Sequence, residues 1–167
     1  MRVIKPESMS VRDHIEVTQL AEKQLAELMS WHYLENQDKG DAIDYIAPNG
    51  KRIEIKFDWD SIMTGNHYLE FAQTVDGWNS TDPSGIALSE DKADYWVVVN
   101  EEFIRIFEMD TLVRWLKDNR TRFETRETRT GVNHNLPGQY SRGYIIPFVD
   151  IDNVVLLKSP SSIERPK

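Results

Sequence analysis

The stretch that most constrains the fold runs from Asp44 to Lys56 and reads Asp-Tyr-Ile-Ala-Pro-Asn-Gly-Lys-Arg-Ile-Glu-Ile-Lys. Apolar and polar residues alternate on both sides of a Pro-Asn-Gly break, which predicts two short strands joined by a tight turn. The segment Ala47-Pro48-Asn49-Gly50 has Pro in its second place and Gly in its fourth. These places suit a type I turn that ends in a left-handed residue. We therefore expect a β-hairpin here.

The length of the loop decides which side chains share a face of this hairpin. A loop of two residues would turn the carboxylate of Asp44 away from Glu54 and Lys56, because successive side chains of a strand alternate between faces. A loop of three residues pairs Asp44 with Glu54, and the turn residues favour this longer loop. The turn chemistry thus predicts that two carboxylates and one ammonium converge on one patch.

Such a patch suits a hard divalent cation. Mg²⁺ prefers oxygen ligands and keeps several waters, so Asp44 and Glu54 together with a phosphate are sufficient to hold it. A bound metal lowers the pKa of a water and stabilises charge in phosphoryl transfer. Lys56 is placed to hold the phosphate or to orient the attacking water.

The order of Asp44, a hairpin and Glu54-Ile55-Lys56 resembles the PD-(D/E)XK nuclease superfamily, and most closely its Holliday-junction resolvases from phages and archaea. Ile43 occupies the place of the nominal motif's proline, which members often lack. The resemblance implies an α/β, restriction-endonuclease-like fold with a central mixed β-sheet flanked by helices. It also implies a deoxyribonuclease that depends on Mg²⁺ or Mn²⁺, with Asp44 and Glu54 as metal ligands. DNA is then the partner, branched or junction DNA the preferred substrate, and a homodimer the functional unit.

A helix is predicted over residues 11–34, where leucines recur at helical spacing. Its segment 21–28 resembles the first helix of the junction resolvases, which carries an acidic residue after a small one. The resemblance therefore implies that Glu22 is a third catalytic carboxylate, whereas glutamate is also a routine surface residue of helices. Asp41 competes with Asp44 for the metal, but the two face opposite ways on a strand, and the hairpin register selects Asp44.

Later segments predict the remaining elements: strands at 67–74, 93–100 and 101–108, helices at 84–92 and 110–119, and late strands at 144–149 and 154–157. Residues 57–66 and 75–83 are expected to be loops. On the strand at 67–74, Glu70 is a candidate ligand or base, although a solvated acid is the commoner case. His67 has no partner at metal-ligand spacing and is interpreted as structural.

Residues 120–142 form a long polar stretch rich in arginine and threonine, and we expect a loop. Residues 110–142 carry seven basic and four acidic side chains, a net charge of +3 that leaves −11 on the rest of the chain. Such a segment suits a phosphate backbone, and a salt-bridged surface is the alternative. The candidate nucleic-acid contacts are Arg120, Arg122, Arg126, Arg129 and Arg142.

The 167 residues suit a single domain with a loose tail from residue 159. The absence of cysteine, of a membrane-spanning run and of a signal-peptide pattern favours the cytoplasm, that of the host cell if a phage encodes the chain. The net charge of −8 is unusual for a nucleic-acid enzyme. Two alternatives therefore stay open: a restriction- or homing-type nuclease or an exonuclease, and a non-catalytic module that binds nucleic acid or protein.

Overall fold

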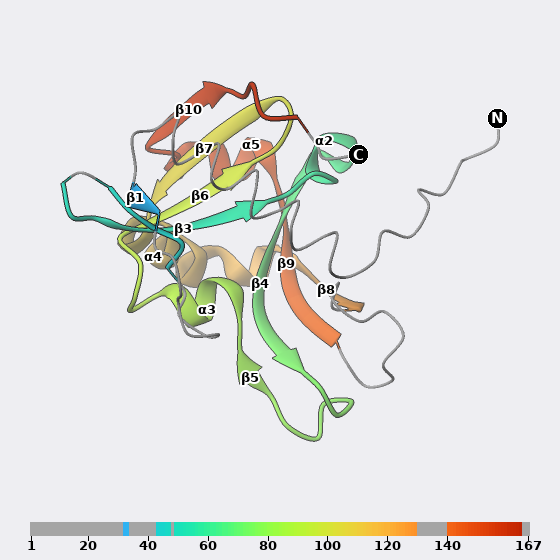
Figure 1. Cartoon of the computed structure of the whole chain (residues 1–167). Coiled ribbons are helices and arrows are strands. Elements are labelled where there is room, and N and C mark those ends of the chain that lie inside the picture. Colours follow the sequence, from blue (N-terminus) through green and yellow to red (C-terminus); the bar gives the residue numbers. More distant parts are fainter. Residues whose placement is uncertain (1–31, 34–42, 48, 130–139, 165–167) are drawn as a thin grey trace.

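The computed structural model describes residues 32–33, 43–47, 49–129 and 140–164. It has a mixed α/β architecture in which helices flank two β-sheets, as Figure 1 shows. The elements in chain order are β1 (His32–Tyr33), β2 (Tyr45–Ile46), β3 (Arg52–Phe57), α2 (Ser61–Thr64), β4 (Asn66–Thr74), β5 (Asp82–Pro83), α3 (Gly85–Ser89), β6 (Tyr95–Val99), β7 (Phe103–Glu108), α4 (Met109–Asn119), η1 (Arg120–Arg122), β8 (Glu124–Arg129), β9 (Tyr140–Pro147), α5 (Phe148–Ile151), η2 (Asp152–Val154) and β10 (Leu157–Pro160). The α/β prediction is confirmed, with two sheets where one central sheet was expected.

The first sheet has six strands in the order β1-β2-β3-β6-β7-β10. β3 and β6 are parallel and the other neighbours are antiparallel, so the sheet is mixed. β6 is almost wholly buried, as its apolar run predicted. The β6–β7 turn is closed by Asn100, whose Oδ1 accepts hydrogen bonds from the backbone N–H groups of Glu102 and Phe103, both at 2.9 Å.

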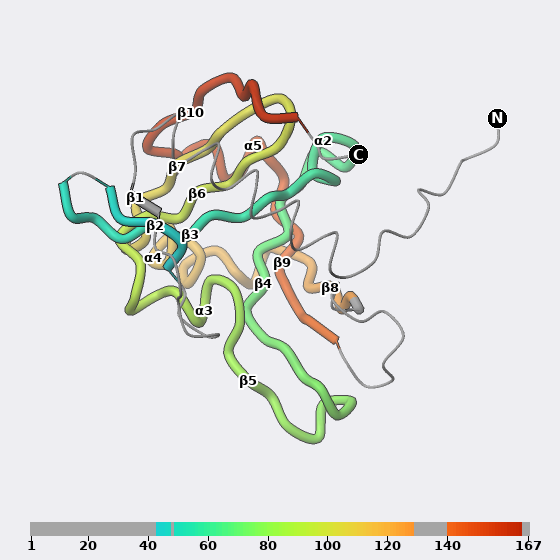
Figure 2. Tube along the Cα trace, in the orientation of Figure 1, coloured from blue at the N-terminus to red at the C-terminus, as the bar shows by residue number. Residues whose placement is uncertain are grey.

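The second sheet has four strands in the order β5-β4-β9-β8. β4 and β9 pair along almost their whole length, with a bulge between Glu70 and Ala72. Figure 2 shows the two strands running side by side toward the end that carries β5. This sheet is joined to the first through β3, α2 and β4, so the polar end of β3 leads directly into it.

Several predictions about chain segments are wrong in part. The expected loops at 57–66 and 75–83 contain α2 and β5, and the strand expected at 154–157 overlaps η2 and only the first residue of β10. The expected loop at 120–142 contains η1, β8 and the start of β9. β8 is a charged edge strand without apolar residues. Its sequence therefore lacks the alternation of apolar and polar residues from which a strand is predicted. The expected tail from residue 159 contains the end of β10, and Ile163 beyond it is buried. The helix expected up to Leu34 does not reach that far, because His32–Tyr33 form β1 on β2; residues 1–31 lie outside the described residues.

Two apolar clusters form the core, one on each face of the six-stranded sheet. The first includes Ile53, Ile55 and Val97. The second contains Trp96 and Val98 together with residues of α3, α4, β4 and β9. Figure 1 shows α3 and α4 beneath β6, with β4 and β9 descending beside them. The described part of the chain holds no helix that is long and apolar enough to cross a membrane.

Candidate metal centre

The β2–β3 hairpin has the three-residue loop that its turn residues predicted. The backbone N–H of Gly50 donates to the carbonyl of Ala47 at 2.8 Å, and Gly50 has the left-handed φ of 79°. Tyr45 pairs with Ile53, so the adjoining position places Asp44 opposite Glu54. The predicted register is confirmed, and Asp44, Glu54 and Lys56 project from the same face.

Hydrogen bonds fix the two carboxylates and the ammonium relative to one another. Asp44 Oδ2 accepts from the backbone N–H of Ile55 at 2.7 Å. Lys56 Nζ donates to Glu54 Oε1 and lies 5.6 Å from the centroid of the Trp96 ring. Glu54 is only 5% exposed, whereas the Lys56 side chain is 43% exposed. Glu54 is therefore buried, Asp44 is half-buried, and the Lys56 side chain reaches solvent over part of its length.

Burial and repulsion shift the pKa values of the cluster. Burial and the nearby Asp44 carboxylate together raise the pKa of Glu54 to about 7, although Lys56 opposes the shift. Burial also raises the pKa of Asp44, although Lys56 and the Ile55 N–H oppose it. Burial would lower the pKa of Lys56, but the two carboxylates outweigh burial and raise it. Near neutral pH, Lys56 is charged and the carboxyl pair retains part of a proton.

The donor set fits a divalent cation. Glu54 Oε2 is buried and, within the described part of the chain, has no hydrogen-bond partner. A buried oxygen without a partner is costly unless a ligand satisfies it. No group of three or more His, Cys, Asp or Glu side chains converges on one point among the described residues, and Asp44 and Glu54 are the candidate protein ligands. Two carboxylates suit Mg²⁺, which completes its coordination with water and phosphate.

The other candidates for this centre lie elsewhere or outside the described residues. Glu22 and Asp41 fall on residues that are not described, so their roles stay predictions. Glu70 accepts a hydrogen bond from the hydroxyl of Ser84, and its charge contributes to the raised pKa of Lys56. It therefore lies within electrostatic reach of the cluster.

The five arginines proposed for nucleic acid do not form one row. Arg126 lies opposite Gly143, so it projects from one face of the four-stranded sheet and the adjacent Arg142 projects from the other. Arg142 stacks 4.3 Å from the ring centroid of Trp78 and lies 3.3 Å from Glu127. Arg120 and Arg122 belong to η1, and Arg129 ends β8. Their contacts with nucleic acid stay predictions.

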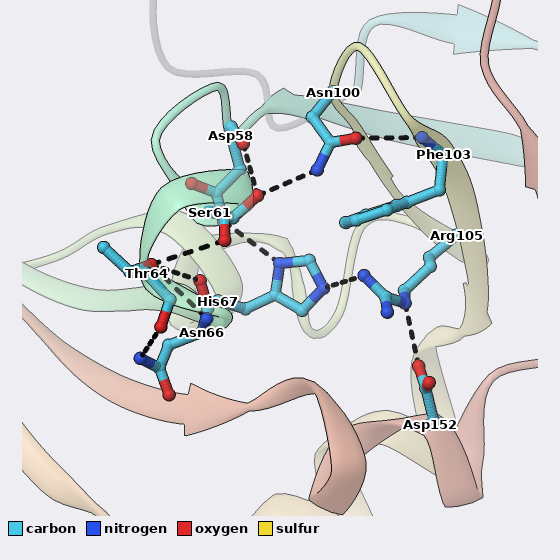
Figure 3. A network of polar contacts seen from close by, with 9 residues as sticks. All are labelled: Asp58, Ser61, Thr64, Asn66, His67, Asn100, Phe103, Arg105 and Asp152. Carbon is cyan, nitrogen blue, oxygen red and sulfur yellow. Dashed lines mark hydrogen bonds and ion pairs between the residues drawn. The ribbon is translucent and has the colours of Figure 1, made fainter.

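A buried polar network was missed from the sequence, and Figure 3 shows it. His67 is 1% exposed; its Nδ1 lies 3.0 Å from Asp58 Oδ2, and its Nε2 lies 3.1 Å from Arg105 Nη1. Arg105 donates from Nε to Asp152 Oδ1 at 2.8 Å and lies 3.7 Å from the Phe103 ring centroid. The sequence feature that indicates a buried polar network is the single arginine in the otherwise apolar strand segment Phe-Ile-Arg-Ile-Phe. The network explains His67 as a buried, hydrogen-bonded residue outside the candidate metal centre.

Comparison with known proteins leaves the family open. No family model matches the chain, and no curated protein matches it. Among solved structures, it is similar to a bacterial homing endonuclease, I-Ssp6803I, at 22% sequence identity and a TM-score of 0.43. The match covers 59% of this chain and 69% of the endonuclease. At this level of similarity the likeness carries no argument about function.

Proposed function

We propose that this chain is a metal-dependent endodeoxyribonuclease that hydrolyses phosphodiester bonds at the Asp44–Glu54–Lys56 cluster. The observation that carries the proposal is the opposed carboxylate pair, with the unpartnered Glu54 Oε2 and with Lys56 bonded to the same carboxylate. A buried oxygen without a partner is costly, and a bound cation would satisfy it.

Asp44 and Glu54 would hold Mg²⁺ or Mn²⁺. When bound, the metal supplies a water of lowered pKa and positive charge for the phosphoryl transition state. The backbone N–H of Ile55 orients Asp44, so one ligand is positioned before any metal arrives. Lys56 uses one of its three N–H groups to donate to Glu54. The other two remain to donate to a phosphate oxygen or to the attacking water. The raised pKa of Lys56 keeps it cationic for this role.

The finer assignments rest on the resemblance to junction resolvases. Branched DNA as substrate, Glu22 as a third carboxylate, homodimer formation and action in the cytoplasm belong to this proposal. A non-catalytic binding module is the second candidate, and the net charge of −8 favours it because a basic surface is the usual mark of a nucleic-acid enzyme.

Cleavage assays on linear duplex, single strand, flap and four-way junction DNA test the proposal, each with Mg²⁺, with Mn²⁺ and with chelator. Glu54→Gln and Lys56→Met should each lower cleavage at least about a hundredfold, the scale of losing a catalytic group. The matched controls are Glu90→Gln and Lys117→Met, because Lys117 Nζ of α4 also donates to a glutamate, at an exposed site just after α3. They should retain full activity.

Metal-dependent cutting that only the first two variants abolish would support the nuclease, and the preferred substrate would choose among its classes. If no substrate is cleaved and no metal binds, the nuclease proposal is wrong and the non-catalytic binding module is the remaining candidate.

A further inference from the structure

A cavity of about 540 Å³ lies beyond the end of β3, outside the Asp44–Glu54–Lys56 cluster. Its walls come from α2 and the turn before it, from the start of β4, and from β8 and β9. Cavities that bind small molecules measure about 300–1,000 Å³, so this one is large enough for a ligand. The phosphodiester chemistry proposed above uses none of its residues.

One wall presents hydrogen-bond acceptors. Asp58 Oδ2 contacts the buried His67, which holds the carboxylate in place and leaves a second oxygen on the same group. Asn66 Nδ2 donates to the carbonyl of Thr64 at 2.7 Å, so its Oδ1 is the acceptor that remains. Asp60 lines the same cavity. Figure 3 shows Asp58 and Asn66 gathered around the α2 turn. This wall suits a ligand that offers N–H groups.

The facing wall presents a cation and hydroxyl groups. The Arg126 side chain is 55% exposed, and its contact with Glu124 Oε1 is 3.7 Å, longer than a hydrogen bond. Tyr68 Oη and Thr128 Oγ1 lie 3.0 Å and 2.9 Å from Ser141 Oγ, so the three hydroxyls support one another. Such a wall suits an anion that accepts from a guanidinium.

We infer that this cavity binds one nucleotide of the substrate, turned out of its stack, with the phosphate on Arg126 and the amino edge of the base on Asp58 and Asn66. The inference rests on the proposed function. Enzymes that extrude a base read its edge by hydrogen bonds and pack its face on apolar or aromatic side chains, here Tyr68 and Ile145. Asp58 follows Lys56 by two residues, so the cavity adjoins the strand that carries the cluster.

The charge of the two walls excludes simpler ligands. A free phosphate would meet the carboxylates of Asp58 and Asp60, and a bare cation would meet the guanidinium of Arg126. A nucleotide with an exocyclic amino group satisfies both walls. Cytosine, adenine and guanine carry such a group and thymine does not, and carboxylates accept well from the cytosine amine.

Binding of free dCMP and dTMP to the full chain, followed by NMR chemical shifts in chelator, tests the inference. We expect dCMP to shift the resonances of the cavity residues and to bind about tenfold tighter than dTMP, the scale of one good base-edge contact. Asn66→Ala should remove this preference, and Arg126→Gln should weaken the binding of both nucleotides about tenfold or more, the loss of one charged hydrogen bond. Arg114→Gln, at an exposed position of α4, is the matched control and should bind as wild type.

No binding, binding elsewhere on the chain, or equal affinity for dCMP and dTMP would overturn the inference. The assay contains no metal and needs no turnover, so its outcome is independent of cleavage. If the protein cuts DNA but does not bind dCMP, only the nucleotide-binding inference is wrong. If it binds dCMP in the cavity but never cuts DNA, only the nuclease proposal is wrong.

Discussion

Asp44 lies opposite Glu54 across the β2–β3 hairpin, and the Asp44 carboxylate lies close enough to Glu54 to raise the pKa of that buried carboxyl group. The backbone of Ile55 fixes the first carboxylate, and the ammonium of Lys56 contacts the second. Two acids held this closely resist ionisation together, which is the electrostatic condition that a divalent cation relieves.

The raised pKa of Glu54 predicts a loss of stability on going from acid to neutral pH. The folded protein binds this proton more tightly than the unfolded chain, whose pKa is near 4.5, so the stabilisation is complete below pH 4.5 and is lost as pH rises through about 7. The loss is roughly 3 kcal/mol, because one pKa unit is about 1.4 kcal/mol. Glu54→Gln should therefore exceed wild type in unfolding free energy at pH 8 and approach it at pH 4.

Urea denaturation of both proteins at the two pH values measures this difference, with Glu90→Gln as the exposed control. Identical pH profiles for wild type and Glu54→Gln would show that burial does not perturb the carboxylate.

His67 predicts a pH dependence of opposite sign. Burial lowers its pKa, and the neighbouring Arg105 lowers it too, although Asp58 pulls the other way. The guanidinium donates to Nε2, so the ring is neutral with its proton on Nδ1 toward Asp58. The unfolded chain protonates this histidine near pH 6.5 and the folded protein resists it, so stability falls as pH drops below 6.5.

His67→Asn should flatten this fall between pH 6.5 and 5 while lowering stability at pH 8, where the buried network is intact in wild type. Thermal unfolding across this pH range measures the slope. An unchanged slope in the variant would assign the acid sensitivity to other groups.

Gly143 of β9 packs closely against the Tyr68 ring in the cavity wall, which predicts that a larger residue at this position is not tolerated. A Cβ at this position would lie 2.6 Å from ring atoms of Tyr68 and 2.9 Å from the Leu69 carbonyl, closer than side chains approach. Gly143→Ala should displace Tyr68 and cost about 1–3 kcal/mol, the range for overpacking a core. Chemical denaturation measures the cost, and Thr125→Ala, at an exposed position of the neighbouring β8, is a control for substitution without overpacking. A variant as stable as wild type would mean that the sheet yields at this point.

The hairpin could be predicted because the information is local. Gly50 supplies the left-handed residue, and the resulting register places Asp44 across from Glu54 without reference to the rest of the chain. The strands at β4 and β6 and the helix at α4 were likewise found from periodicity, and they are confirmed within a few residues.

What could not be predicted depends on contacts distant in sequence. β8 reads as a loop because its residues are polar on both faces, and only pairing with β9 makes it a strand. Arg105 and His67 are 38 positions apart, so their hydrogen bond has no local signature. The cavity is assembled from four elements in the same way.

Calorimetric titration of the full chain with Mn²⁺ at pH 7, in two buffers of different ionisation enthalpy, tests the metal centre most directly. The account predicts one site, release of about half a proton because the pKa of Glu54 is about 7, and loss of binding in both Asp44→Asn and Glu54→Gln. Glu90→Gln should bind Mn²⁺ as wild type does. Absence of Mn²⁺ binding, or binding that survives in both variants, would contradict the claim that Asp44 and Glu54 form a divalent-cation site.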